Sequence, residues 1–78
     1  MKAYELIDSP EKWYGGHERG NKFGNCAVTA IVKAYGYGSV QRETVMDYLG
    51  LPIECTLSQW NDSTDWQTVY NTLKSLDI

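Results

Sequence analysis

The sequence predicts a mainly α protein, a small single-domain bundle of three to four short helices with one long Gly-rich loop. Apolar residues recur at helical spacing within residues 25–35 and 64–76, and Gly or Pro marks the ends of three predicted helices. Hydrophobic residues make up 42% of the 78 residues, which is enough for one core at this length. No repeat or linker divides the sequence, so we treat residues 1–78 as a single helical domain.

The first two predicted elements are short. Residues 2–7 are expected to form a turn or short helix that ends before Ser9 and Pro10. Pro10 suits the first position of a second turn, because an N–H at that position would have no hydrogen-bond partner and proline lacks this group. Ser9 is the expected N-cap of this turn. This second turn would carry Trp13 toward the core.

Residues 25–35 give the clearest helical pattern. Asn25 is the expected N-cap, and Gly36 is the expected left-handed residue after the end. The apolar face comprises Ala27, Ala30, Ile31, Ala34 and Tyr35. Because small alanines let another backbone approach closely, we expect this helix to be the central one.

A third helix is predicted for residues 39–49. Ser39 is a suitable N-cap, and Gly50 ends the helix. Its inward stripe is expected to comprise Val45, Leu49 and either Val40 or Met46.

The last helix is predicted for residues 64–76. Thr64 and Gln67 have the spacing of a capping box, and Asp65 in the first turn suits the helix dipole. Its inward residues are expected to be Trp66, Val69, Tyr70, Leu73 and Leu76.

Residues 51–63 precede this helix and begin with alternating apolar and polar residues. Since a lone strand has no partner, we expect an extended connection with a short turn at residues 58–60. Trp60 would pack against the last helix. Asn61 and Asp62 would hydrogen-bond nearby main-chain groups in a turn that leads into it.

Residues 13–25 contain four glycines, three aromatic residues and the single histidine of the chain. Glycine at this density opposes regular structure and predicts a long loop before the central helix. Trp13 and Phe23 are expected to anchor its two ends in the core. Its expected partner-binding residues are His17, Arg19, Lys22 and Tyr14.

Two alternatives for this loop stay open. It is either a connection with no further role, or an anion site, because a Gly-rich loop at a helix start presents main-chain N–H groups. The Lys-Ser/Thr ending of a phosphate loop is missing after Gly24.

Cys26 falls at the start of the central helix, where the helix dipole favours a thiolate. Cysteine hydrolases place their nucleophile in this way, but the only histidine, His17, comes before Cys26. A Cys26–His17 pair is the catalytic alternative to a structural thiol. A metal site built from Cys26, Cys55 and His17 would lack a fourth ligand, and the sequence has no Cys-x-x-Cys spacing. We therefore expect no metal and no other cofactor.

Charge and hydropathy exclude several classes of function. Residues 1–39 include five basic and four acidic side chains, whereas residues 40–78 include two basic and six acidic side chains. Without a basic stripe, direct nucleic-acid binding is not expected. No apolar run reaches the roughly 18–20 residues that span a bilayer, and no apolar export signal opens the sequence. We therefore expect a cytoplasmic protein with reduced cysteines and no membrane contact.

Three motifs follow one another along the chain: Pro10-x-x-Trp13-x-x-Gly16, Cys26-Ala27-x-x-Ala30 and Trp60-Asn61-Asp62. In this order they resemble a family of small uncharacterised proteins of phages and actinobacteria. The resemblance implies a helical fold, a phage or mobile-element origin, and no assigned reaction. Residues 25–51 are similar, in part, to the Cys-bearing helix of papain-like bacteriocin-processing peptidases.

These observations predict a small non-enzymatic binding protein with a protein partner. The resemblance implies a phage-encoded inhibitor or modulator of a host protein, such as an anti-defence protein, in the host cytoplasm. Tyr14, Tyr37 and Tyr48 are expected to be exposed, since aromatic residues are favoured at interfaces. A homodimer is the alternative to a foreign partner. The alternative function is a cysteine hydrolase-like domain or remnant that uses Cys26.

Overall fold

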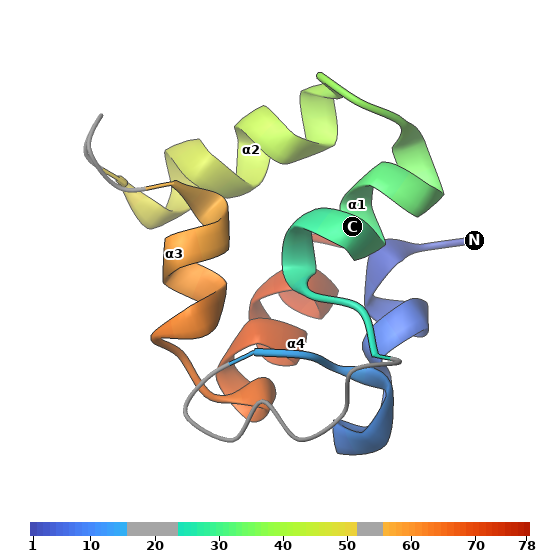
Figure 1. The fold of residues 1–78 in the computed structure, drawn as a ribbon. Helices are drawn as coiled ribbons and strands as arrows, with labels where there is room; N and C mark the ends of the chain where they lie inside the picture. Colours follow the sequence, from blue (N-terminus) through green and yellow to red (C-terminus); the bar gives the residue numbers. More distant parts are fainter. Residues whose placement is uncertain (16–23, 52–55) are drawn as a thin grey trace.

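The structure, a computed structural model, describes residues 1–15, 24–51 and 56–78 (Figure 1). Two 3-10 helices come first, and four α-helices follow. Their bounds are η1 (Ala3–Ile7), η2 (Pro10–Lys12), α1 (Ala27–Tyr35), α2 (Val40–Leu49), α3 (Leu57–Asp62) and α4 (Trp66–Ser75). The mainly α fold predicted from the sequence is confirmed. Within the described residues, one isolated parallel β-bridge joins Trp13 and Asn25.

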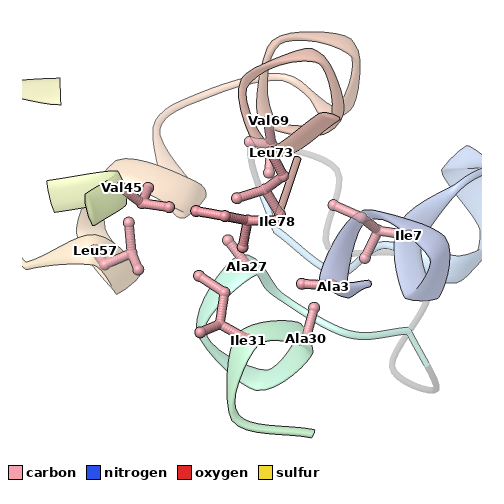
Figure 2. Close-up of a cluster of buried hydrophobic side chains, with 10 residues drawn as sticks. All are labelled: Ala3, Ile7, Ala27, Ala30, Ile31, Val45, Leu57, Val69, Leu73 and Ile78. Atoms are coloured by element: carbon pink, nitrogen blue, oxygen red, sulfur yellow. The ribbon is translucent and has the colours of Figure 1, made fainter. Parts of the chain in front are cut away.

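The core draws side chains from η1 and from all four α-helices (Figure 2). Its buried residues are Ala3, Ile7, Ala27, Ala30, Ile31, Val45, Leu57, Val69, Leu73 and Ile78. Three of them belong to α1, which packs against η1, α2 and α3. Figure 2 shows Ala30 of α1 pointing toward Ala3 of η1, in keeping with the expectation of a central helix.

The N-terminal turns form where the sequence predicts them. η1 packs against α1 and α4, and the indole N–H of Trp66 donates to the main-chain oxygen of Ile7 at 2.7 Å. Pro10 begins η2 and Ser9 occupies its N-cap position, but the Ser9 side chain makes no capping hydrogen bond.

Helix α1 begins later than predicted, with Cys26 rather than Asn25 as its N-cap. The sulfur of Cys26 accepts the N–H of Thr29 at 3.4 Å. Asn25 lies outside the helix because its main chain forms a parallel bridge with Trp13. Gly36 ends the helix with φ 92° and ψ 173°, a positive φ outside the left-handed helical region that was predicted.

Helix α2 has the predicted caps. Ser39 Oγ accepts the N–H of Arg42 at 3.2 Å, and Gly50 ends the helix in the left-handed conformation at φ 60°. Val45 is fully buried and Met46 packs against the core, whereas Val40 is 72% exposed. Of the two alternatives for the inward stripe, Met46 is therefore right and Val40 is wrong.

Helix α3 replaces the extended connection expected for residues 51–63. It begins with a capping box that the sequence analysis missed: Thr56 Oγ1 accepts the N–H of Gln59 at 3.1 Å, and Gln59 Oε1 accepts the N–H of Thr56 at 2.9 Å. The two buried residues of the helix, Leu57 and Asn61, are one turn apart. Residues 52–55, Cys55 included, lie outside the described residues.

Helix α4 starts at Trp66, and its N-cap is Asp65. The predicted capping box of Thr64 and Gln67 is wrong, because the Thr64 hydroxyl donates to the Trp60 carbonyl oxygen and the Gln67 amide donates to Asn71. None of the helices in the described ranges is long and apolar enough to cross a membrane.

Candidate functional site

Asn61 is the one buried polar residue among those described. Its Oδ1 atom accepts two N–H groups, the indole N–H of Trp13 at 2.8 Å and the main-chain N–H of Ala27 at 2.9 Å. Its Nδ2 atom donates to the carbonyl oxygen of Tyr14 at 3.0 Å. A buried amide is costly unless it is hydrogen-bonded, and these three partners satisfy it. We call Asn61, Trp13, Tyr14 and Ala27 the Asn61 junction.

The Asn61 junction joins three parts of the chain that are distant in sequence. Asn61 lies in the last turn of α3, Ala27 begins α1, and Trp13 and Tyr14 follow η2. Tyr14 and Ala27 stand on either side of the Gly-rich segment. One side chain of α3 thus fixes the chain where it enters this segment and where it enters α1.

A pair of main-chain hydrogen bonds strengthens the same connection. The N–H of Tyr14 donates to the Asn25 oxygen at 3.1 Å, and the N–H of Asn25 donates to the Lys12 oxygen at 2.7 Å. These two bonds form the parallel bridge between Trp13 and Asn25. The described residues that flank residues 16–23 therefore lie side by side.

Two glycines are required by this close approach. A Cβ at Gly24 would lie 2.7 Å from the carbonyl carbon of Trp13, a main-chain atom that cannot turn aside. A Cβ at Gly15 would lie 2.2 Å from Nδ2 of Asn61 and 2.8 Å from the Trp13 ring. Glycine at both positions lets the two chain segments and the Asn61 amide pack in direct contact.

The predicted site residues are placed only in part. Trp13 is half-buried and packs against the core, and Tyr14 is half-buried rather than exposed. His17, Arg19, Lys22 and Phe23 lie outside the described residues. The structure therefore describes the base of the predicted binding loop and, of the residues expected to bind, Tyr14 alone.

Cys26 is half-buried, and its thiol is free. The sulfur caps α1 and lies 3.2 Å from the Thr29 hydroxyl. The next N–H along the chain, that of Ala27, is taken by Asn61. No described histidine stands beside Cys26, and the described residues contain no group of three side chains able to hold a metal ion. The thiol as it is seen here has a capping role.

Trp60 and Trp66 were both expected to be structural, and Trp60 packs at the core. Trp60 is half-buried against it. Trp66 stacks on Tyr70 with ring centroids 5.5 Å apart and 23° between the planes, and Tyr4 meets Tyr70 edge-on at 6.2 Å. Asp62 lies next to the junction, with Oδ1 3.5 Å from Nδ2 of Asn61.

Asn61 itself has a different role from the one expected. It was expected to form a local turn ahead of the last helix, but it bonds atoms 34 to 48 residues earlier in the chain. Its place in the Trp60-Asn61-Asp62 motif is the only sequence signal that marks it. No local pattern shows that an asparagine will be buried against distant main-chain groups.

Neither the protein-family models, nor the curated proteins, nor the solved structures that we compared with this chain give a significant match. The resemblance to small phage and actinobacterial proteins therefore stays a prediction.

Proposed function

We propose that the chain is a small non-enzymatic binding protein whose Gly-rich segment, residues 16–23, contacts a protein partner. The observation that carries the proposal is the junction at its base: two main-chain bonds and the Asn61 amide hold the flanking residues together. Loops with tied ends are frequently functional, since fixing the ends removes part of the entropy lost on binding. The whole connection from η2 to α1, residues 13–26, has fourteen residues. A connection between helices needs only about two to eight, so this length also calls for a reason.

The chemistry of the segment indicates the kind of partner. His17, Arg19 and Lys22 stand against the single acid Glu18, so the segment is cationic within an otherwise acidic chain. Arginine and tyrosine are enriched at the energetic centres of interfaces, and Tyr14 lies at the base of the segment. We propose an acidic surface on another protein as the partner.

The proposed biological setting rests on the resemblance. A phage-encoded protein of this kind would bind and inhibit or modulate a host protein, such as one that serves in defence, inside the host cytoplasm. The capping role of the Cys26 thiol supports a non-enzymatic function, because it gives this side chain a structural reason to be there.

Affinity purification with two charge-matched variants tests the proposal. Wild-type protein, Arg19→Ala/Lys22→Ala and Lys2→Ala/Lys74→Ala serve as bait in host lysate, and captured proteins are identified by mass spectrometry. Lys2 pairs with Asp77 and Lys74 lies over the ring of Tyr70, so their removal lowers the charge equally and leaves the described residues that flank the segment unchanged.

We expect one protein to be captured by the wild type and by the Lys2/Lys74 variant, and to be lost with the Arg19/Lys22 variant. Equal capture by all three baits would contradict the proposal that residues 16–23 contact the partner. No protein above background with micromolar bait would contradict the binding function itself.

A further inference from the structure

Helix α2 carries an outer face that takes no part in the core. We define the α2 outer face as Tyr37, Val40, Glu43, Thr44, Asp47 and Tyr48. In Figure 1, α2 runs along the top edge of the molecule, with α1 and α3 beneath it. The exposed positions of α2 fall on one side of a helical wheel, opposite the buried Val45.

Large apolar side chains are concentrated on this face. Tyr37 is 90% exposed, Val40 72% and Tyr48 62%. Among the described residues, the only other large hydrophobic side chain that is exposed is Met1. Neither tyrosine hydroxyl has a hydrogen-bond partner within the described ranges. Clustered exposed apolar residues beside polar ones are typical of interaction sites.

Two carboxylates flank these apolar residues. Glu43 and Asp47 are exposed and lie one helical turn apart. The ion pairs seen in the described part of the chain are Lys2–Asp77 and Lys12–Asp8, so neither acid of α2 is paired there. The one cation of α2, Arg42, is half-buried on the inner side, with its Nε atom inaccessible to solvent. The α2 outer face therefore presents negative charge alone.

We propose that the α2 outer face binds a cationic amphipathic segment of another protein, with apolar side chains against Val40 and Tyr48 and Lys or Arg against Glu43 and Asp47. Charge complementarity selects this occupant. The same acids repel nucleic acid and anionic lipid. In a two-fold contact between two copies of α2, Glu43 of each copy would approach Asp47 of the other, so a second copy is disfavoured.

The size of the α2 outer face indicates the binding affinity to expect. Ten residues of α2 extend about 15 Å, which matches a partner helix of about three turns. An interface of this size is at the small end of specific contacts, so binding in the micromolar range is expected. This proposal concerns residues of α2 and Tyr37 rather than residues 16–23, and it does not depend on the proposed function.

The probe is a synthetic helical peptide of about 14 residues, with Leu along one face and Lys and Arg on its flanks. The control peptide has Glu in place of every Lys and Arg. Each is titrated into nitrogen-15-labelled protein, and amide shifts are followed by NMR at about 0.05 M and about 0.3 M salt. Tested variants are Glu43→Gln/Asp47→Asn and Tyr48→Ala. The charge-matched control is Glu5→Gln/Asp77→Asn, which removes two exposed acids from η1 and from the chain after α4.

We expect the cationic peptide to shift amides of residues 37–48 and the acidic peptide to shift none. Affinity should fall about fivefold in Glu43→Gln/Asp47→Asn and in Tyr48→Ala, stay unchanged in the control variant, and fall at the higher salt. Shifts spread over all acidic surfaces, or equal losses in the control variant, would overturn the proposal. So would concentration-dependent shifts of residues 37–48 without peptide, because they would make a second copy the occupant.

Discussion

The Oδ1 atom of Asn61 accepts the indole N–H of Trp13 at 2.8 Å, across 48 residues of sequence. The same oxygen accepts the first N–H of α1, that of Ala27. One amide at the end of α3 thus connects the segment before the Gly-rich region to the helix that follows it.

Replacement of Asn61 by alanine removes the connection and leaves three groups without these hydrogen bonds, the buried N–H of Ala27 and the part-buried groups of Trp13 and Tyr14. Since an unpaired buried polar group costs about 1–3 kcal/mol, Asn61→Ala should lower the free energy of unfolding by about 3–5 kcal/mol. Urea denaturation measures the change. The matched control is Asn71→Ala on the exposed side of α4, where a change below about 0.5 kcal/mol is expected. Similar small effects of both replacements would mean that the Asn61 bonds contribute little.

Gly24→Ala should lower stability more than Gly50→Ala, because only at Gly24 does the added Cβ collide with main-chain atoms. At Gly50 the added Cβ meets open space, and only the positive φ of 60° is strained, which costs about 1–2 kcal/mol. At Gly24 the added Cβ meets the main chain of Trp13 at 2.7 Å, so the bridge must open at a cost of about 2 kcal/mol or more. Thermal unfolding of both variants gives the order. The reverse order would show that the two segments separate at little cost.

Cys26→Ser should keep the cap of α1, and Cys26→Ala should lose it. A lost N-cap costs about 1 kcal/mol, so the alanine variant should be less stable than the wild type by that amount and the serine variant should not. Denaturation curves of the two variants give this comparison.

The same thiol also allows a test of the hydrolase alternative. A structural, half-buried thiol should be alkylated by iodoacetamide more slowly in the folded protein than in urea. Faster alkylation of Cys26 in the folded protein than in urea would favour the catalytic alternative instead.

The cap of α4 makes stability depend on pH. Hydrogen bonds from the side chain and the main-chain N–H of Thr68 hold the pKa of Asp65 below its usual value. Because the folded pKa is depressed, the ionised carboxylate stabilises the fold above about pH 4 and this contribution is lost as pH falls through the lower, folded value. Asp65→Asn keeps an acceptor for the cap but does not titrate, so its stability should fall less than that of the wild type between pH 6 and pH 2. Parallel acid unfolding curves for the two proteins would contradict this assignment.

Sequence patterns predict most of the fold because α1 and α4 contain enough apolar positions to show a helical period, and because Ser39 and Gly50 are strong local signals at the two ends of α2. Helix α3 could not be predicted in this way, since six residues show no period and the alternation from Leu51 to Leu57 is typical of a strand. The N-cap of α1 was predicted at Asn25 by residue preference, but tertiary pairing of Asn25 with the chain before the loop moves it to Cys26.

The site is less predictable than the fold. The glycines between residues 13 and 25 indicate a loop but do not show that its flanking residues meet. The Asn61 junction uses main-chain groups of Tyr14 and Ala27, which have no side-chain signature. Burial of an asparagine against distant backbone is a tertiary property, and only the structure shows it.

Hydrogen exchange at two protons tests the junction most directly. The indole N–H of Trp13 and the amide N–H of Ala27 both donate to Asn61 Oδ1, so in the wild type both should exchange slowly, near the rate set by global unfolding. In Asn61→Ala both protons should exchange much faster. The amide of Leu73, buried in the last turn of α4, should still exchange at the rate set by global unfolding of that variant. Fast exchange of the Trp13 and Ala27 protons in the wild-type protein would contradict the account.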